Sequence, residues 1–210
     1  MSGPLGVVSD SPACTRDVAE ALGRAIDPVP RGGLVVVLLG DLGAGKTVFA
    51  SGLARGLGVP ASTPVTSPTF TVAKAYRGRV PLHHVDAFHV RSLAELEAAG
   101  LEEMGGDGRV TCVEWGDRVP AAWPADRLEV SLTPLASPAP RPGSGPSAPR
   151  LGSGPSGPKE GSGPSALPFP EPPRRIEVQA LGPLAAGILE RARPAVLARC
   201  GERAKGPATA

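Results

Sequence analysis

Residues 34–47 decide the fold, and they read LVVVLLGDLGAGKT. Residues 34–39 are apolar without alternation and rich in β-branched side chains, which is typical of a strand buried on both faces of a parallel sheet. Residues 40–47 fit the pattern G-x-x-x-x-G-K-[ST]. Residues 46–57 repeat apolar side chains every four positions and therefore predict a helix. A buried strand, a glycine-rich loop and a helix in this order predict a phosphate-binding loop.

Each residue type in this loop has a chemical reason. The glycines let the backbone turn its N–H groups inward around an anion, at a helix N-terminus whose dipole favours negative charge. Lys46 is expected to reach the β- and γ-phosphates as a movable positive charge. Thr47 offers a hydroxyl to Mg²⁺, a hard cation that prefers oxygen ligands. The sequence thus predicts nucleotide binding.

Two carboxylates follow predicted strands further along the chain. Asp86 ends residues 81–86 (PLHHVD), and Glu114 ends RVTCVE within residues 109–115. Ligands gather at the carboxyl ends of strands in open α/β sheets, and phosphoryl transfer needs a magnesium carboxylate and a group that orients water. The strand before Glu114 resembles a Walker B strand. Either carboxylate could instead be an ordinary surface group.

Two neighbouring features have open interpretations. Residues 66–71 (TSPTFT) place hydroxyls around a stiff proline and could sense the γ-phosphate, or form a plain turn. Trp115 could anchor the core or form a lid over the site. The histidines of the same strand point to opposite faces. His84 shares one face with Asp86, while His83 lies on the other face and is expected to be structural.

Around this centre, helices are predicted over residues 15–26 and 184–193 and after Ser92, and further strands over residues 71–76 and 128–132. Residues 175–180 (RIEVQA) alternate apolar and polar side chains, like an edge strand. The elements predict an α/β fold with a mixed, mostly parallel sheet. Gly52 and Gly56 should weaken their helix, by roughly 1 kcal/mol each relative to alanine.

Residues 134–173 contain 13 prolines, 7 glycines and 7 serines, and GSGPS occurs three times at a nine-residue period. Such a segment cannot bury enough apolar surface to offset its loss of entropy, so we expect a disordered insertion. Because longer loops cost little extra closure entropy, the strands that flank the insertion could pair across it. We expect one domain made of residues 1–133 and 174–195, with a flexible tail over residues 196–210.

Composition and charge exclude several classes of protein. The 210 residues carry a formal net charge of +2, which provides no strong field for nucleic acid or an anionic membrane. No apolar run approaches the roughly 18 residues of a membrane span, and no secretory signal pattern opens the chain. The three cysteines are far apart and do not suggest a disulfide scaffold or a zinc site. We expect a cytoplasmic protein.

Taken together, GDLGAGKT, SPTFT, H-x-D-x-[YF] and a strand that ends in Glu-Trp resemble the TsaE (YjeE) family of small bacterial ATPases. The resemblance implies a P-loop three-layer α/β sandwich. It also implies ATP hydrolysis in support of threonylcarbamoyladenosine synthesis in tRNA, together with TsaB and TsaD, so that tRNA is met only indirectly. ATP, rather than GTP, rests on this resemblance, since the chain has no N-K-x-D guanine motif.

The resemblance also assigns residues. Thr47 and Glu114 would hold Mg²⁺, and Lys46, Asp86 and Glu114 would be the catalytic residues. The nucleotide would be bound by Asp41, Leu42, Gly43, Ala44, Gly45, Lys46, Thr47, Ser67, Thr69 and Trp115.

The sequence departs from the family pattern H-x-D-x-Y-R, since Phe88 and His89 replace the tyrosine and the arginine. His89 would be a weaker, pH-dependent cation, and Arg91 could substitute for it. This departure keeps two other functions open, a small-molecule kinase on the same fold and a nucleotide-binding module without catalysis.

Overall fold

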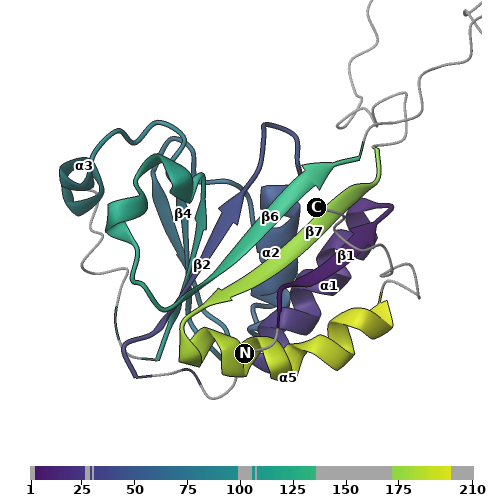
Figure 1. Ribbon diagram of the computed structural model, residues 1–210. Helices are drawn as coiled ribbons and strands as arrows, with labels where there is room; N and C mark the ends of the chain where they lie inside the picture. Colours follow the sequence, from purple (N-terminus) through teal and green to yellow (C-terminus); the bar gives the residue numbers. More distant parts are fainter. Residues whose placement is uncertain are drawn as a thin grey trace, which may run out of the picture.

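The computed structural model describes residues 3–26, 29, 31–98, 106, 108–135 and 172–199. Within them, seven strands form one sheet in the order β1-β7-β6-β2-β5-β4-β3 (Figure 1). The strands are β1 (Leu5–Ser9), β2 (Leu34–Leu39), β3 (Ala73–Tyr76), β4 (Leu82–Asp86), β5 (Val110–Glu114), β6 (Arg127–Pro134) and β7 (Arg174–Leu181). Strands β6, β2, β5 and β4 are parallel neighbours at the centre of the sheet, and β3, β7 and β1 add antiparallel pairs. The predicted mixed sheet is confirmed.

Helices cover the two faces of the sheet unequally. One face carries the long helices α1 (Pro12–Ala25), α2 (Lys46–Gly56) and α5 (Pro183–Arg199) (Figure 1). The other carries the short α3 (Leu93–Ala98) and the 3₁₀ turns η1 (Gly116–Arg118) and η2 (Pro120–Ala122). The fold is therefore a three-layer sandwich with one thin layer. None of the helices that the structure describes is long and apolar enough to cross a membrane.

Strand β2 lies between two cores, which explains its unbroken apolar sequence. Val36 and Leu38 belong to the larger core under α1 and α2, whereas Val37 belongs to the smaller core with Trp123. Successive side chains of a strand point to opposite faces, so a strand covered on both sides needs apolar residues at every position.

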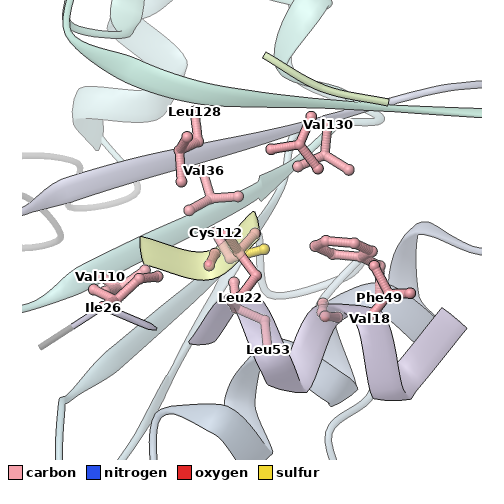
Figure 2. Close-up of a cluster of buried hydrophobic side chains, with 14 of the residues drawn as sticks. Val18, Leu22, Ile26, Val36, Phe49, Leu53, Val110, Cys112, Leu128 and Val130 are labelled. Atoms are coloured by element: carbon pink, nitrogen blue, oxygen red, sulfur yellow. The ribbon is translucent and has the colours of Figure 1, made fainter. Parts of the chain in front are cut away.

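Figure 2 shows the larger core, in which side chains of α1 and α2 meet those of β2, β5 and β6. Phe49 and Leu53 of α2 and Leu22 of α1 are fully buried there. This packing fixes α2, and with it the phosphate loop, against the carboxyl ends of the central strands. Burial raises the pKa of the Cys112 thiol well above its usual range, which disfavours the thiolate.

The glycines of α2 have a packing role. A Cβ on Gly52 would overlap the carbonyl oxygen of Arg16, and one on Gly56 would overlap that of Glu20. Both oxygens belong to α1, so the two helices can approach this closely only where α2 lacks side chains. The lower helix propensity of glycine is thus offset by the contact of α1 with α2.

One strand assignment was wrong. Strand β7 is not at the edge of the sheet, because it pairs with β6 on one side and with β1 on the other. Its alternation arises because the long helices cover only one of its faces. The strand at this edge is β1 (LGVVS), whereas β3 forms the opposite edge. Strand β1 was not predicted from the sequence, because five residues with a glycine give only a weak pattern.

Strands β6 and β7 pair as predicted across the proline-rich segment, with Pro134 opposite Arg174. The amide of Leu135 also donates to the carbonyl of Pro173 at 2.7 Å. Residues 136–171, where disorder was predicted, lie outside the described residues. Helix α5 continues past Pro194 to Arg199, because Val196 still packs into the core. The predicted tail therefore does not begin at residue 196, and residues 200–210 lie outside the described residues.

Candidate nucleotide site

The phosphate loop has the backbone of an anion-binding turn. Gly43 has φ of 80° and Gly45 has φ of 98°, both in the left-handed region that favours glycine. Gly45 is the N-cap of α2, so the first N–H groups of the helix follow directly. Helix N-termini leave such groups without partners inside the helix, and their dipole favours an anion. The loop therefore offers N–H donors and positive potential at the same place.

Lys46 holds its ammonium group inside the loop. The Nζ atom donates to the carbonyl oxygens of Gly40 at 2.6 Å and Asp41 at 2.9 Å. It also lies 3.4 Å from the ring centroid of Trp115, and the residue is only 5% exposed. Burial lowers the pKa of Lys46, and the nearby carboxylate of Glu114 is the strongest opposing influence. The site thus contains a desolvated cation, which attracts anions more strongly than an exposed one.

Glu114 is fixed through both of its oxygens. Thr47 Oγ1 donates to Oε2 at 3.0 Å, and His84 Nε2 lies 2.9 Å from Oε1. A carboxylate only accepts, so Nε2 carries the proton when Glu114 is ionised. His84 is fully buried, and its Nδ1 is one of two buried side-chain atoms without a hydrogen-bond partner among the described residues. The histidine therefore orients Glu114 towards Thr47.

Asp86 organises the segment that contains Ser67 and Thr69. Its Oδ2 accepts hydrogen bonds from Ser67 Oγ and, at 2.7 Å, from Thr69 Oγ1, and its Oδ1 accepts from the amide of Phe88 at 2.9 Å. Asp86 also lies opposite Glu114 in the parallel pairing of β4 with β5. Residues 66–71 are thus more than a plain turn, because these contacts hold the hydroxyls of Ser67 and Thr69 beside Asp86.

These side chains surround a cavity of about 410 Å³. Its lining consists of Leu42, Gly43, Gly45, Lys46, Thr47, Val48, Ser67, Thr69, Asp86, Phe88, Glu114, Trp115 and Arg174. Ten of the twelve predicted site residues line the cavity, and two, Asp41 and Ala44, do not. Ala44 is buried at 1% exposure, and Asp41 contributes its carbonyl oxygen to Lys46.

Trp115 lies over Lys46 and also packs, partly buried, against the smaller core. It has φ of 62°, which is uncommon for a bulky residue, and its ring contacts the Lys46 ammonium. Its ring lies 5.1 Å from that of Phe88, and the guanidinium of Arg118 lies 4.8 Å from the Phe88 ring centroid. The buried tryptophan of the smaller core is Trp123. Trp115 therefore has both a core contact and a contact with the Lys46 ammonium, and both interpretations of it remain open.

The cation expected from the family pattern is not at the cavity. His89 and Arg91 are exposed, and neither lines the cavity. The arginine that lines it is Arg174, which lies 130 residues after Ala44 in the sequence yet donates to its carbonyl oxygen at 3.1 Å. Sequence reasoning did not identify Arg174, because no local motif surrounds it and its position depends on the pairing of β6 with β7.

The residues at the Thr47–Glu114 contact fit a magnesium ion. A hydroxyl and a carboxylate are hard oxygen donors, and Mg²⁺ is usually bound by one or two protein oxygens together with phosphate oxygens and water. No group of three or more His, Cys, Asp or Glu side chains suited to a metal occurs in the described part of the chain. A nucleotide would have to supply the remaining ligands.

Comparison with known proteins agrees with this geometry. The family model of threonylcarbamoyl adenosine biosynthesis protein TsaE matches residues 9–138, which is more than half of the chain and includes every site residue except Arg174. The chain belongs to the TsaE family. The match ends before β7, so the strand that supplies Arg174 lies outside it.

Several curated relatives carry the name tRNA threonylcarbamoyladenosine biosynthesis protein TsaE. The one from Treponema pallidum is 40% identical over 129 residues, which cover 61% of this chain and 91% of that protein. The one from Bacillus subtilis is 38% identical over 114 residues, covering 54% and 70% of the two chains. The crystal structure of YdiB from Bacillus subtilis superimposes with a TM-score of 0.59 at 25% identity and covers 92% of this chain and 97% of that one.

Proposed function

We propose that this TsaE-family protein binds and hydrolyses ATP and thereby supports threonylcarbamoyl modification of the adenosine next to the anticodon in tRNA. The observation that carries the proposal is the cavity where the phosphate loop, Lys46 and the Thr47–Glu114 contact meet. The names of the curated relatives support the place in tRNA modification.

The loop and Lys46 would bind the phosphates. Backbone N–H groups at the start of α2 would donate to phosphate oxygens, and the Lys46 ammonium would exchange its carbonyl contacts for them. Thr47 and Glu114 would hold Mg²⁺, which neutralises phosphate charge when it is bound. Trp115 would cover the cation and limit the access of water.

Asp86 would orient the attacking water. In the structure its Oδ2 accepts from Ser67 and Thr69, so both hydroxyls already lie beside the cavity. When these hydroxyls turn to a γ-phosphate, Asp86 becomes available as the acceptor for a water proton. Glu114 is less suited to this role, because His84 and Thr47 occupy both of its oxygens.

We further propose that the partners are TsaB and TsaD, that tRNA is met only through that complex, and that the protein acts in the cytoplasm. The near-neutral formal charge of +2 supports an indirect encounter with tRNA.

ATP turnover with and without TsaB and TsaD tests this function. We expect slow hydrolysis by the protein alone, faster hydrolysis in the complex, and loss of both in Asp86→Asn. Failure to bind the TsaB–TsaD pair would refute the role in modification. Hydrolysis that survives in Asp86→Asn would refute the assignment of this carboxylate.

A further inference from the structure

Arg174 is a buried charge at the rim of the nucleotide cavity. The residue is only 3% exposed. Arginine is almost never buried without specific partners, so such burial calls for an explanation. It is the first residue of β7, opposite Pro134 of β6 and Ser9 of β1. The chain therefore returns from the proline-rich segment directly at the phosphate loop.

The contact of Arg174 with the loop is specific. Its Nη1 donates to the carbonyl oxygen of Ala44 at 3.1 Å. A Cβ on Gly45 would overlap this same nitrogen, so the guanidinium fills the space that a side chain would take. Glycine is thus required at position 45 for two reasons. Its backbone is in the left-handed region, and a side chain there would overlap the guanidinium of Arg174.

This hydrogen bond fixes the direction of a loop amide. In a planar trans peptide, the carbonyl oxygen and the following N–H point in opposite directions. The group that follows the Ala44 carbonyl is the N–H of Gly45. Holding the oxygen towards Arg174 therefore turns the Gly45 N–H away from the guanidinium, and Gly45 lines the cavity.

We infer that Arg174 is a positioning residue of the nucleotide site, which orients the Ala44–Gly45 peptide for phosphate and adds a permanent positive charge beside it. This inference rests on the proposed nucleotide binding. It extends the site to the β6–β7 hairpin, so that the two halves of the domain on either side of residues 136–171 both contribute to it. Arginine suits the position because its planar guanidinium stays charged when buried.

The test compares Arg174→Met with Arg175→Met by calorimetric titration with ADP and with inorganic pyrophosphate, in EDTA. Arg175 is the adjacent residue of the same strand, and it is exposed. We expect Arg174→Met to weaken both ligands at least tenfold and Arg175→Met to change them less than twofold. Arg174→Lys, which keeps the positive charge and an N–H donor group but not the planar guanidinium, should recover part of the loss.

A purely structural role would give a different result. Arg174→Met would then have a lower melting temperature, but its folded form would bind ADP and pyrophosphate as the parent protein does, and this would overturn the inference. If Arg174→Met fails to fold, NMR titration of the parent protein with ADP decides. We expect the Gly45 amide and the Arg174 Nε–H resonances to shift with the same midpoint, and an Arg174 resonance that stays still while Gly45 moves would overturn the inference. A parent protein that binds no ADP would instead refute the proposed function.

Discussion

Replacing Lys46 with methionine tests the most specific electrostatic feature of the site. Methionine keeps most of the length and volume of the buried side chain, so we expect the variant to fold, with its stability lowered by the loss of two hydrogen bonds. The substitution removes the ammonium that contacts the carbonyl oxygens of Gly40 and Asp41 and the ring of Trp115.

The expected loss of nucleotide affinity follows from two opposing terms. Unit charges about 4 Å apart attract by about 4 kcal/mol at an effective dielectric constant of 20. In the free protein the ammonium already makes hydrogen bonds worth about 1.5–3 kcal/mol each, and part of these is given up on binding. We take the difference as about 2 kcal/mol, which corresponds to about 30-fold weaker binding.

The assay is calorimetric titration with ADP in EDTA, with Lys74→Met as the matched control. Lys74 is exposed on β3 and lies 5.3 Å from the ring centroid of Tyr76, outside the cavity lining. The control should bind as the parent does. A folded Lys46→Met protein whose dissociation constant is within threefold of the parent would refute the assignment of Lys46.

Three further predictions concern the metal contact, the insertion and pH. In Glu114→Gln, ATP turnover should fall at least about 100-fold, or about 2.7 kcal/mol, and Mg²⁺ should no longer strengthen ADP binding, whereas binding in EDTA should persist; undiminished turnover would exclude this ligand. Removal of residues 138–172 should leave melting temperature and turnover nearly unchanged, because β6 and β7 pair without them; a large fall in melting temperature would show a structural role. Burial, helped by Arg109, lowers the pKa of His83, so the unfolded state binds the proton more readily and stability is lost as pH falls through about 6.5. The melting temperature of His83→Gln minus that of the parent should therefore be larger at pH 5.5 than at pH 7.5. An equal difference in melting temperature at the two pH values would contradict this.

The sequence predicted the centre of the fold because local and global requirements agree there. The apolar run of β2 needs cover on both faces, and the glycines of the loop need left-handed backbone. Asp86 and Glu114 were predicted to lie at the carboxyl ends of strands. Strands β4 and β5 are parallel neighbours, so the two carboxylates lie side by side. These features depend on residues close together in the sequence.

The features that were missed depend on distant pairing. Strand β1 is short and becomes a strand through its pairing with β7. Arg174 reaches the phosphate loop only because β7 pairs with β6 across the insertion. The helical residues after Pro194 are held by the burial of Val196 against the core. No local pattern carries this information, since it arises from tertiary contacts.

The most direct test of the account is calorimetric titration of the unsubstituted protein with ATP in the presence of saturating Mg²⁺. We predict one nucleotide bound per chain, with amide resonances of Gly43, Gly45 and Thr47 shifting as the site fills. No heat of binding at millimolar ATP, together with unchanged amide resonances in the loop, would contradict the claim that this cavity holds a nucleotide.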